Sequence, residues 1–190
     1  MTIVFNELKE WIMTFISFIP GNIGKIIRRL IYKLFLKSSN KINIDRGCII
    51  LSGKNIRLGK SVSIGRNSFI TATDGNLIIG ENSVIGMNAH INADCSEMIQ
   101  IGSNCIVGPN LLIRASNHNY QDTSKLIREQ GHIRDKVIIE NNVWIGANVT
   151  ILGKAHIKSG SVIAAGSVVF KEFEDSVLIA GNPAVAVKEL

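Results

Sequence analysis

The sequence predicts a parallel β-helix, in which short strands wind into triangular coils and the coils stack on one another. Three observations lead to this prediction. Aliphatic residues recur at steps of six over residues 58–169, a period that fits neither an α-helix nor a hairpin. Glycine directly follows seven of these fifteen aliphatic positions, as a chain turning sharp corners would require. The period is interrupted three times, always after a third unit, so one coil takes three units.

Residues 1–41 differ from the rest of the chain and predict a pair of α-helices. Apolar residues follow helical spacing up to Ile19, the "PGN" of residues 20–22 breaks the run, and the spacing resumes from Ile23 to Leu34. The second run carries basic residues opposite its apolar stripe, namely Lys25, Arg28, Arg29, Lys33 and Lys37. We therefore expect two helices with a bend between them.

This pattern in the second helix has two interpretations. An apolar stripe opposed by basic residues is typical of a helix lying in a membrane interface, which predicts peripheral membrane contact through residues 23–37. The helices could instead cap the repeat stack, because the ends of such stacks need shielding from water. The two interpretations are compatible, and the sequence leaves both open. Neither run is expected to span a membrane, since spanning requires about 20 consecutive apolar residues.

The composition limits the class of protein. The 190 residues are 46% hydrophobic and 19% charged, which allows a sizeable core. Of the net charge of +6, residues 1–41 supply most, with seven Lys or Arg against two Glu. The folded body thus lacks the basic face of a nucleic-acid-binding protein. The three cysteines, Cys48, Cys95 and Cys105, have the spacing of neither a disulfide framework nor a zinc site, so we expect a cytoplasmic location.

Residues 42–190 are expected to form the β-helix, with about five to six coils and strands roughly 4.8 Å apart. Because each insertion follows the third unit of a coil, all three should leave the prism at the same edge. The third insertion, residues 114–138, is the longest and should protrude as a loop. Loops of this size tend to be functional. It contains "RASNHNY", and with it His118.

Several segments resemble the hexapeptide-repeat acyltransferases, in the branch that acetylates sugars and polysaccharides. They are "IGENSVIGMNAHI", "IGSNCIVGPNLLI", the block of residues 139–169 and the ending "AGNPA". The resemblance implies a left-handed β-helix, acetyl-CoA as acyl donor and a pantetheine groove between neighbouring prisms. Three flat faces and an edge that supplies only half a cleft further predict a homotrimer.

His118 is the candidate general base. Acetylation of a hydroxyl needs a group that removes the hydroxyl proton as the oxygen attacks the thioester, and histidine titrates near neutrality. His118 leaves the prism at the inserted edge, and "NHNY" is similar to the histidine segment of sugar acetyltransferases in this family. Asn92, one coil below the start of the loop, is the candidate donor to the negative oxygen of the intermediate. The alternatives are a polar loop histidine and a corner-capping asparagine.

The other histidines, His90, His132 and His156, are expected to be solvated or packed residues. Carbonic anhydrases that share this prism bind zinc through histidines, including a pair spaced five apart. Five residues after His118 stands Thr123, so no metal site is expected.

The resemblance also implies which residues contact acetyl-CoA. It implies that Trp144 flanks the pantetheine groove, that Ala147 and Ala165 offer backbone groups, and that Lys171 and Lys188 lie near the nucleotide phosphates.

Together these features predict an acetyl-CoA-dependent O-acetyltransferase acting on a carbohydrate hydroxyl, in surface polysaccharide biosynthesis. The amphipathic N-terminus favours an acceptor at the inner face of the cytoplasmic membrane. Acetylation of serine or of an antibiotic is an alternative within the enzyme class. A non-catalytic trimeric scaffold is an alternative of a different class.

Overall fold

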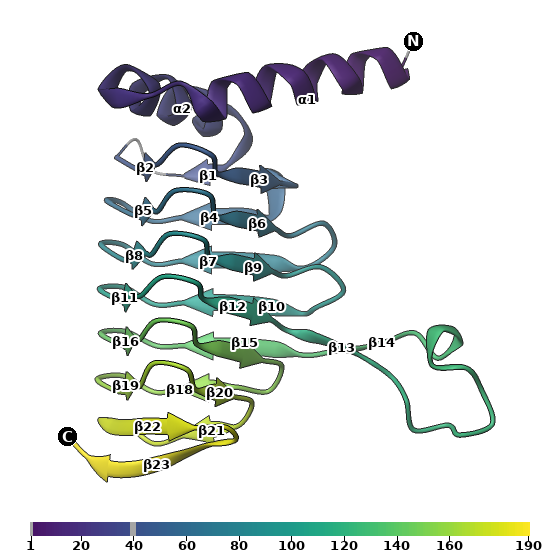
Figure 1. The fold of residues 1–190 in the computed structure, drawn as a ribbon, viewed down its shortest axis with the longest axis vertical. Coiled ribbons are helices and arrows are strands. Elements are labelled where there is room, and N and C mark those ends of the chain that lie inside the picture. Colours follow the sequence, from purple (N-terminus) through teal and green to yellow (C-terminus); the bar gives the residue numbers. More distant parts are fainter. Residues whose placement is uncertain (1, 39–40) are drawn as a thin grey trace.

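The protein is a stack of coils capped by two helices, as a computed structural model describing residues 2–38 and 41–190 shows (Figure 1). Helix α1 (Thr2–Phe18) and helix α2 (Gly21–Phe35) lie across the N-terminal end of the stack. The break between them falls at Ile19 and Pro20, which confirms two helices with a bend. The helices cover the first coil, where the Arg28 guanidinium donates to the Ile44 carbonyl oxygen (Figure 1).

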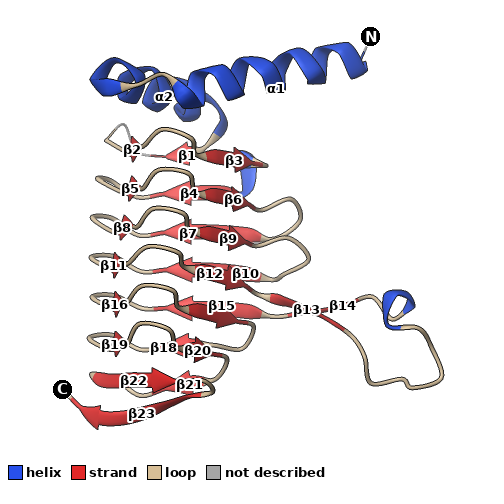
Figure 2. Cartoon of the chain, in the orientation of Figure 1, coloured by secondary structure: helices blue, strands red, loops and turns tan. Residues whose placement is uncertain are grey.

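Parallel strands form the three faces of the prism (Figure 2). Sheet A holds β1 (Lys37–Ser38), β4 (Ile56–Leu58), β7 (Asn76–Ile79), β10 (Met98–Ile101), β15 (Lys136–Ile139), β18 (His156–Ile157) and β21 (Glu172–Phe173). Sheet B holds β2 (Asn43–Ile44), β5 (Ser63–Ile64), β8 (Val84–Ile85), β11 (Ile106–Val107), β16 (Trp144–Ile145), β19 (Val162–Ile163), β22 (Val177–Gly181) and β23 (Ala184–Glu189). Sheet C holds β3 (Ile49–Leu51), β6 (Phe69–Thr71), β9 (His90–Asn92), β12 (Leu112–Arg114), β17 (Thr150–Leu152) and β20 (Val168–Val169).

Over the described ranges 2–38 and 41–190, six coils contribute a strand to every sheet. A seventh coil contributes β21 and β22 and ends in β23, which pairs antiparallel to β22. The stack is thus slightly longer than the five to six coils expected. The expected division between residues 41 and 42 falls inside the first coil, because β1 already pairs with β4.

The hydrophobic core runs along the axis of the prism. All fifteen aliphatic positions of the six-residue period are buried, which confirms the inward register of the repeat. The parallel pairing stacks equivalent residues of successive coils, for example Ile79 on Ile101 and Ile101 on Ile139. Burying one such side chain contributes roughly 1.5 to 3 kcal/mol to folding.

The glycines at the corners allow neighbouring coils to stack closely, and they do not adopt the positive φ angles that favour glycine. A Cβ on Gly146 would lie 2.6 Å from the backbone nitrogen of Ala165 in the next coil, so only glycine lets the two coils approach there. Asparagines take much of the left-handed backbone, among them Asn88, Asn110 and Asn148 with φ of 57°, 61° and 57°. Their side chains also bond from coil to coil, with N···O distances of 3.1 and 2.8 Å. The expectation that glycine supplies the corner geometry was therefore wrong in its physical reason.

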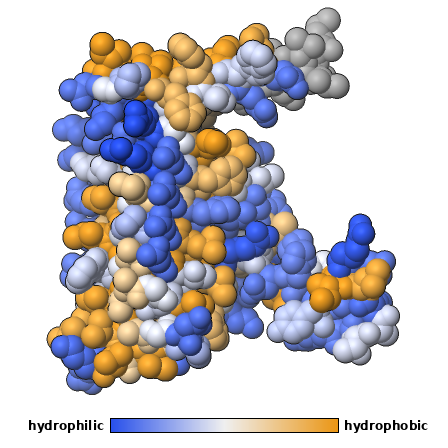
Figure 3. Space-filling view, viewed as in Figure 1, coloured by the Kyte–Doolittle hydropathy of each residue, from blue (hydrophilic) through white to orange (hydrophobic). Residues whose placement is uncertain are grey.

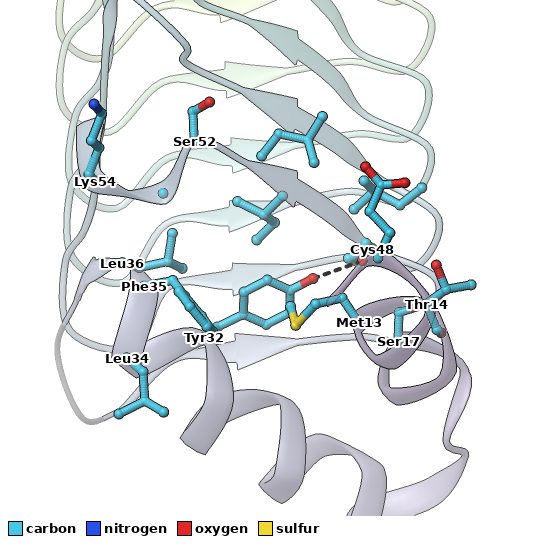
Figure 4. Close-up of a pocket in the computed structure, with 15 residues that line it drawn as sticks. Met13, Thr14, Ser17, Tyr32, Leu34, Phe35, Leu36, Cys48, Ser52 and Lys54 are labelled. Carbon is cyan, nitrogen blue, oxygen red and sulfur yellow. Dashed lines mark hydrogen bonds between the residues drawn. The ribbon is translucent and has the colours of Figure 1, made fainter. Parts of the chain in front are cut away.

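A cleft of about 810 Å³ separates the helices from the first coil (Figure 4). Tyr32 points into this region, and its hydroxyl donates a hydrogen bond of 3.1 Å to the Cys48 carbonyl oxygen. Burial, and then the nearby Cys48 thiol, raise the pKa of Tyr32 to about 12. The cleft lies at the N-terminal end of the stack and is lined by none of the predicted site residues.

The three cysteines are free, and their burial predicts unequal reactivity. Burial raises the pKa of the Cys48 thiol to about 11 and raises the pKa of Cys105 as well, so neither should form a thiolate at neutral pH. Cys95 is only half-buried, in an insertion turn. Titration of the native protein with a thiol reagent should show one fast thiol, and Cys95→Ser should remove it. Two or more fast thiols would contradict this burial pattern.

Candidate active site

The three insertions leave the prism at one edge, as the spacing predicts. They follow β6, β9 and β12 of sheet C and precede β7, β10 and β15 of sheet A. In Figure 1 they extend from the same side of the stack. We call this edge, between sheets C and A, the CA edge.

The longest insertion is a two-stranded arm and not an irregular loop. Strands β13 (Ser116–His118) and β14 (His132–Arg134) pair antiparallel, and a 3₁₀ turn, Ile127–Glu129, lies near the tip. The protrusion itself was expected. The pairing was not, because β13 and β14 are short and polar and lack the alternation that marks a strand.

The base of the arm is fastened to the two shorter insertions. The Arg134 guanidinium donates to a carboxylate oxygen of Asp74 at 3.2 Å, to its carbonyl oxygen at 2.9 Å and to the Ser96 carbonyl oxygen at 2.8 Å. The Cys95 backbone N–H donates to the Asp74 carboxylate at 2.6 Å. That N–H, and then the Arg134 guanidinium, hold the pKa of Asp74 below its ordinary value. The arm therefore leaves the prism from a hydrogen-bonded base.

The outer part of the arm is also internally bonded. The Gln130 side chain accepts from the Asp122 N–H at 3.0 Å and donates to the Asp122 carbonyl oxygen at 2.9 Å. The Ser124 hydroxyl and Lys125 donate to the Asp122 carboxylate, and these contacts lower the pKa of Asp122. These bonds close the chain between the two strands into a defined turn.

His118 is exposed on this arm, and its ring lies against that of His132. The two residues are opposite each other in the strand pair, with ring centroids 4.3 Å apart. His132 is exposed, as expected of a solvated residue, and only the antiparallel register of the arm reveals its contact with His118. Within the described part of the chain, no group of three or more His, Cys, Asp or Glu side chains could hold a metal ion.

Asn92 ends β9 at the CA edge, where it pairs with Arg114 of β12. The placement one coil below the start of the arm was expected. The side-chain oxygen of Asn92 accepts a 2.9 Å bond from the Asp94 N–H, the contact of a corner-capping asparagine. Its amide nitrogen is the group that can donate to a ligand.

Trp144, Ala147 and Ala165 gather at a different edge, between sheets B and C. Trp144 is 56% exposed on the outer side of β16. Ala147 and Ala165 follow it at the corners of successive coils, and the Gly166 N–H donates to the Ala147 carbonyl oxygen at 2.9 Å. The Ala147 carbonyl is thus engaged within the prism, which leaves its N–H as the group to offer a ligand.

Lys171 and Lys188 both lie in the last coil and are exposed. Lys171 borders a pocket of about 190 Å³ formed with Val168, Phe170, Pro183, Ala184 and Val185. Its ammonium lies 5.3 Å from the centre of the Phe173 ring. Lys188 is in β23 opposite Leu178, on sheet B, and is not part of that pocket.

One chain therefore carries two separate groups of candidate residues. His118 and Asn92 belong to the CA edge, whereas Trp144, Ala147 and Ala165 belong to the edge between sheets B and C. The strands of sheet C lie between these two edges.

A prism of six-residue units with an inserted arm defines a hexapeptide-repeat protein. Residues 136–171 match the family model of the bacterial transferase hexapeptide (six repeats), and residues 76–115 match that of the hexapeptide repeat of succinyl-transferase. The chain belongs to the hexapeptide-repeat acyltransferase family.

Similar proteins include a galactoside O-acetyltransferase of Lactococcus lactis, 33% identical over 67% of this chain and 62% of that protein. The putative lipopolysaccharide biosynthesis O-acetyl transferase WbbJ of Escherichia coli is 25% identical over 84% of each chain. Among solved structures, AntD, an N-acyltransferase from Bacillus cereus in complex with dTDP and 3-hydroxybutyryl-CoA, matches with a TM-score of 0.75 and 19% identity over 91% of this chain and 89% of that one. The chain spans 61 to 64% of the length of the first three curated relatives.

Proposed function

We propose that the protein is an acetyl-CoA-dependent O-acetyltransferase that acetylates a carbohydrate hydroxyl in surface polysaccharide biosynthesis. The observation that carries the proposal is His118, an exposed histidine on an arm with a hydrogen-bonded base, at the edge that also carries Asn92. The relatives that act on galactosides and in lipopolysaccharide biosynthesis support the choice of acceptor. Acetyl-CoA as donor implies a cytoplasmic location.

In the proposed reaction, the His118 imidazole removes the proton of the acceptor hydroxyl while its oxygen attacks the thioester carbonyl. The Asn92 amide donates to the oxygen that becomes negative in the tetrahedral intermediate. Collapse of the intermediate breaks the carbon–sulfur bond, and the imidazolium returns the proton to the departing CoA thiolate. The products are an O-acetylated carbohydrate and CoA, and the histidine ends in its starting state.

The site is proposed to form between protomers of a homotrimer with the left-handed winding of the family. The separation of the two groups of candidate residues onto different edges of one prism supports this arrangement. In it, the arm of one protomer reaches the edge of its neighbour, where Trp144 flanks the pantetheine and the backbones of Ala147 and Ala165 contact it. Lys171 and Lys188 are proposed to contact the nucleotide phosphates.

Sheet B offers an apolar face for the trimer contact. Its outward residues form one ladder across successive coils, and they include Val84, Ile106, Trp144 and Val162. Ile106 is 61% exposed in the single chain. The corresponding ladder on sheet A mixes apolar and polar residues, namely Arg57, Ile78, Gln100, Ile138, His156 and Glu172. Buried interface cores are depleted of charge, which favours sheet B over sheet A.

Ile106→Arg should therefore reduce the trimer to monomers without unfolding the prism, because the side chain points outward from β11. Light scattering measures the outcome as a fall from three times the 20.8 kDa chain mass to one. Gln100→Arg, at an outward position of sheet A, is the matched control and should stay trimeric. A monomeric parent, or a trimeric Ile106→Arg variant, would contradict the proposed interface.

The function itself is tested by measuring CoA release from acetyl-CoA with a panel of acceptors. Galactosides and oligosaccharides should support release, whereas serine and chloramphenicol should not. If serine or an antibiotic were acetylated faster than the carbohydrates, that compound class would be the acceptor in place of the proposed carbohydrate. Calorimetry with acetyl-CoA separates the enzyme from a scaffold, since a scaffold should bind none.

A further inference from the structure

The outer side of the helical cap is apolar. Among the side chains that the structure describes, eight large apolar ones of α1 and α2 are exposed there: Leu8, Trp11, Ile12, Phe15, Phe18, Ile23, Ile26 and Leu30. These eight residues are the outer face of the cap. Trp11 and Phe15 are 75% and 74% exposed. Leu34 and Phe35 are exposed as well, but they line the cleft toward the first coil. Figure 3 shows orange surface along this end of the molecule. Contiguous exposed apolar surface of this kind marks an interaction site.

The side of the cap that faces the coils is, by contrast, the hydrogen-bonding side. Arg28 is 1% exposed, and its guanidinium donates to the carbonyl oxygens of Ser17 and Ile19 at 3.2 and 2.7 Å, where α1 ends. It also donates to the Ile44 carbonyl oxygen of the first coil at 2.9 Å. A helix leaves its last carbonyls without partners, and a cation there is favourable. Tyr32 and Leu36, which are 3% and 6% exposed, are buried in the core on the same side. The apolar side chains on the opposite side of the helices therefore point outward. The expected position of Arg28 on an open basic face is therefore wrong.

The remaining basic residues of α2 border the outer face. Lys25, Arg29 and Lys33 follow at four-residue steps along one flank of the helix, and Lys25 and Lys33 are exposed. An apolar surface bordered by Lys and Arg matches a bilayer surface that carries anionic lipids. Over the described residues, neither helix is long and apolar enough to cross a membrane.

We propose that the outer face docks onto the surface of an anionic lipid bilayer, with both helices lying in its plane and the coils standing away from it. The helices cross the end of the stack, so the outer face looks away from the coils and not sideways toward a trimer partner (Figure 1). A second copy meeting this face head-on would bring two rows of Lys and Arg together, whereas anionic lipid neutralises them. The occupant is therefore the bilayer.

The proposal is tested with the full chain and sedimented vesicles. The protein should bind vesicles of phosphatidylglycerol and phosphatidylcholine, and binding should weaken at high salt and with phosphatidylcholine alone. Trp11→Gln combined with Phe15→Gln should lower the bound fraction at least tenfold, on the order expected from the lost apolar burial. Lys25→Gln combined with Lys33→Gln should weaken binding on the order of 10-fold. With Trp144→Phe as background, the emission of Trp11 should shift to the blue on binding.

The matched control is Leu126→Gln combined with Ile127→Gln, which removes two exposed apolar side chains from the arm and should leave vesicle binding unchanged. Equal recovery with and without anionic vesicles would overturn the proposal. So would a larger assembly without lipid that the Trp11 and Phe15 substitutions dissociate, because the outer face would then be covered by a second copy. Vesicle binding is measured without turnover, so its failure is distinguishable from failure of the proposed acetyl transfer.

Discussion

Replacing His118 with alanine should lower turnover by roughly 100-fold to 10,000-fold, the ordinary cost of removing a general base. The fold should survive, because His118 is exposed and β13 pairs through its backbone. Affinity for acetyl-CoA should also survive, since the proposed cofactor contacts lie at another edge of the prism. Steady-state rates at saturating acetyl-CoA, with circular dichroism and calorimetry on the same samples, measure all three quantities.

His132→Ala is the matched control for this experiment. It removes the other member of the ring pair from the opposite strand of the same arm, and it should change turnover only a few-fold. A His118→Ala variant with turnover within a few-fold of the parent would remove His118 from the mechanism. A large loss in His132→Ala alone would assign the base to His132 instead.

Arg28→Met should lower the free energy of unfolding by about 3 kcal/mol or more. Hydrogen bonds to a charged donor contribute about 1.5 to 3 kcal/mol each, and their loss leaves buried carbonyls unpaired. The affected acceptors are the carbonyl oxygens of Ser17, Ile19 and Ile44, so the loss should be concentrated in the cap. Methionine preserves length and helix propensity, and therefore isolates the contribution of the guanidinium.

Chemical denaturation measures the total loss of unfolding free energy in Arg28→Met. Limited proteolysis shows where the protein is destabilised, and we expect the first cleavage within residues 2–36. Lys33→Met is the control on the same helix, because Lys33 is exposed, and its stability should stay within about 0.5 kcal/mol of the parent. Equal stability of the two variants would show that the buried guanidinium contributes nothing to holding the cap.

The spacing of aliphatic residues determined the prism and the edge of its insertions. A six-residue period leaves one inward register, and every one of its positions is buried. Because each interruption follows a third unit, the arm could be assigned to the CA edge before its shape was known. For the same reason Asn92 could be placed beside the start of the arm.

The start of the first coil could not be predicted from the six-residue period. Strand β1 comes right after α2 and has only two residues, which are too few to show a period. Only the pairing of β1 with β4 shows that the stack begins there.

The contact between His118 and His132 required the tertiary structure, because thirteen residues lie between them and the arm carries no alternating pattern. The distance of 4.3 Å between the two ring centroids follows from the antiparallel register of the arm, which the side-chain hydrogen bonds of Arg134 and Gln130 support. Hydrogen bonds of this kind cannot be predicted from the spacing of apolar residues along the chain.

The sequence by itself determined the repeat, its register, the two helices and the place of the arm, since each depends on the periodic burial of apolar side chains. The tertiary structure alone decided which side of the cap faces outward. Amphipathic spacing divides a helix into two faces, but it does not say which one meets the protein. That choice followed from unpaired carbonyl groups at the end of α1 and in the first coil, which Arg28 satisfies from inside. These hydrogen bonds act together with the burial of Tyr32 and Leu36, which pack in the core on the same side of the cap.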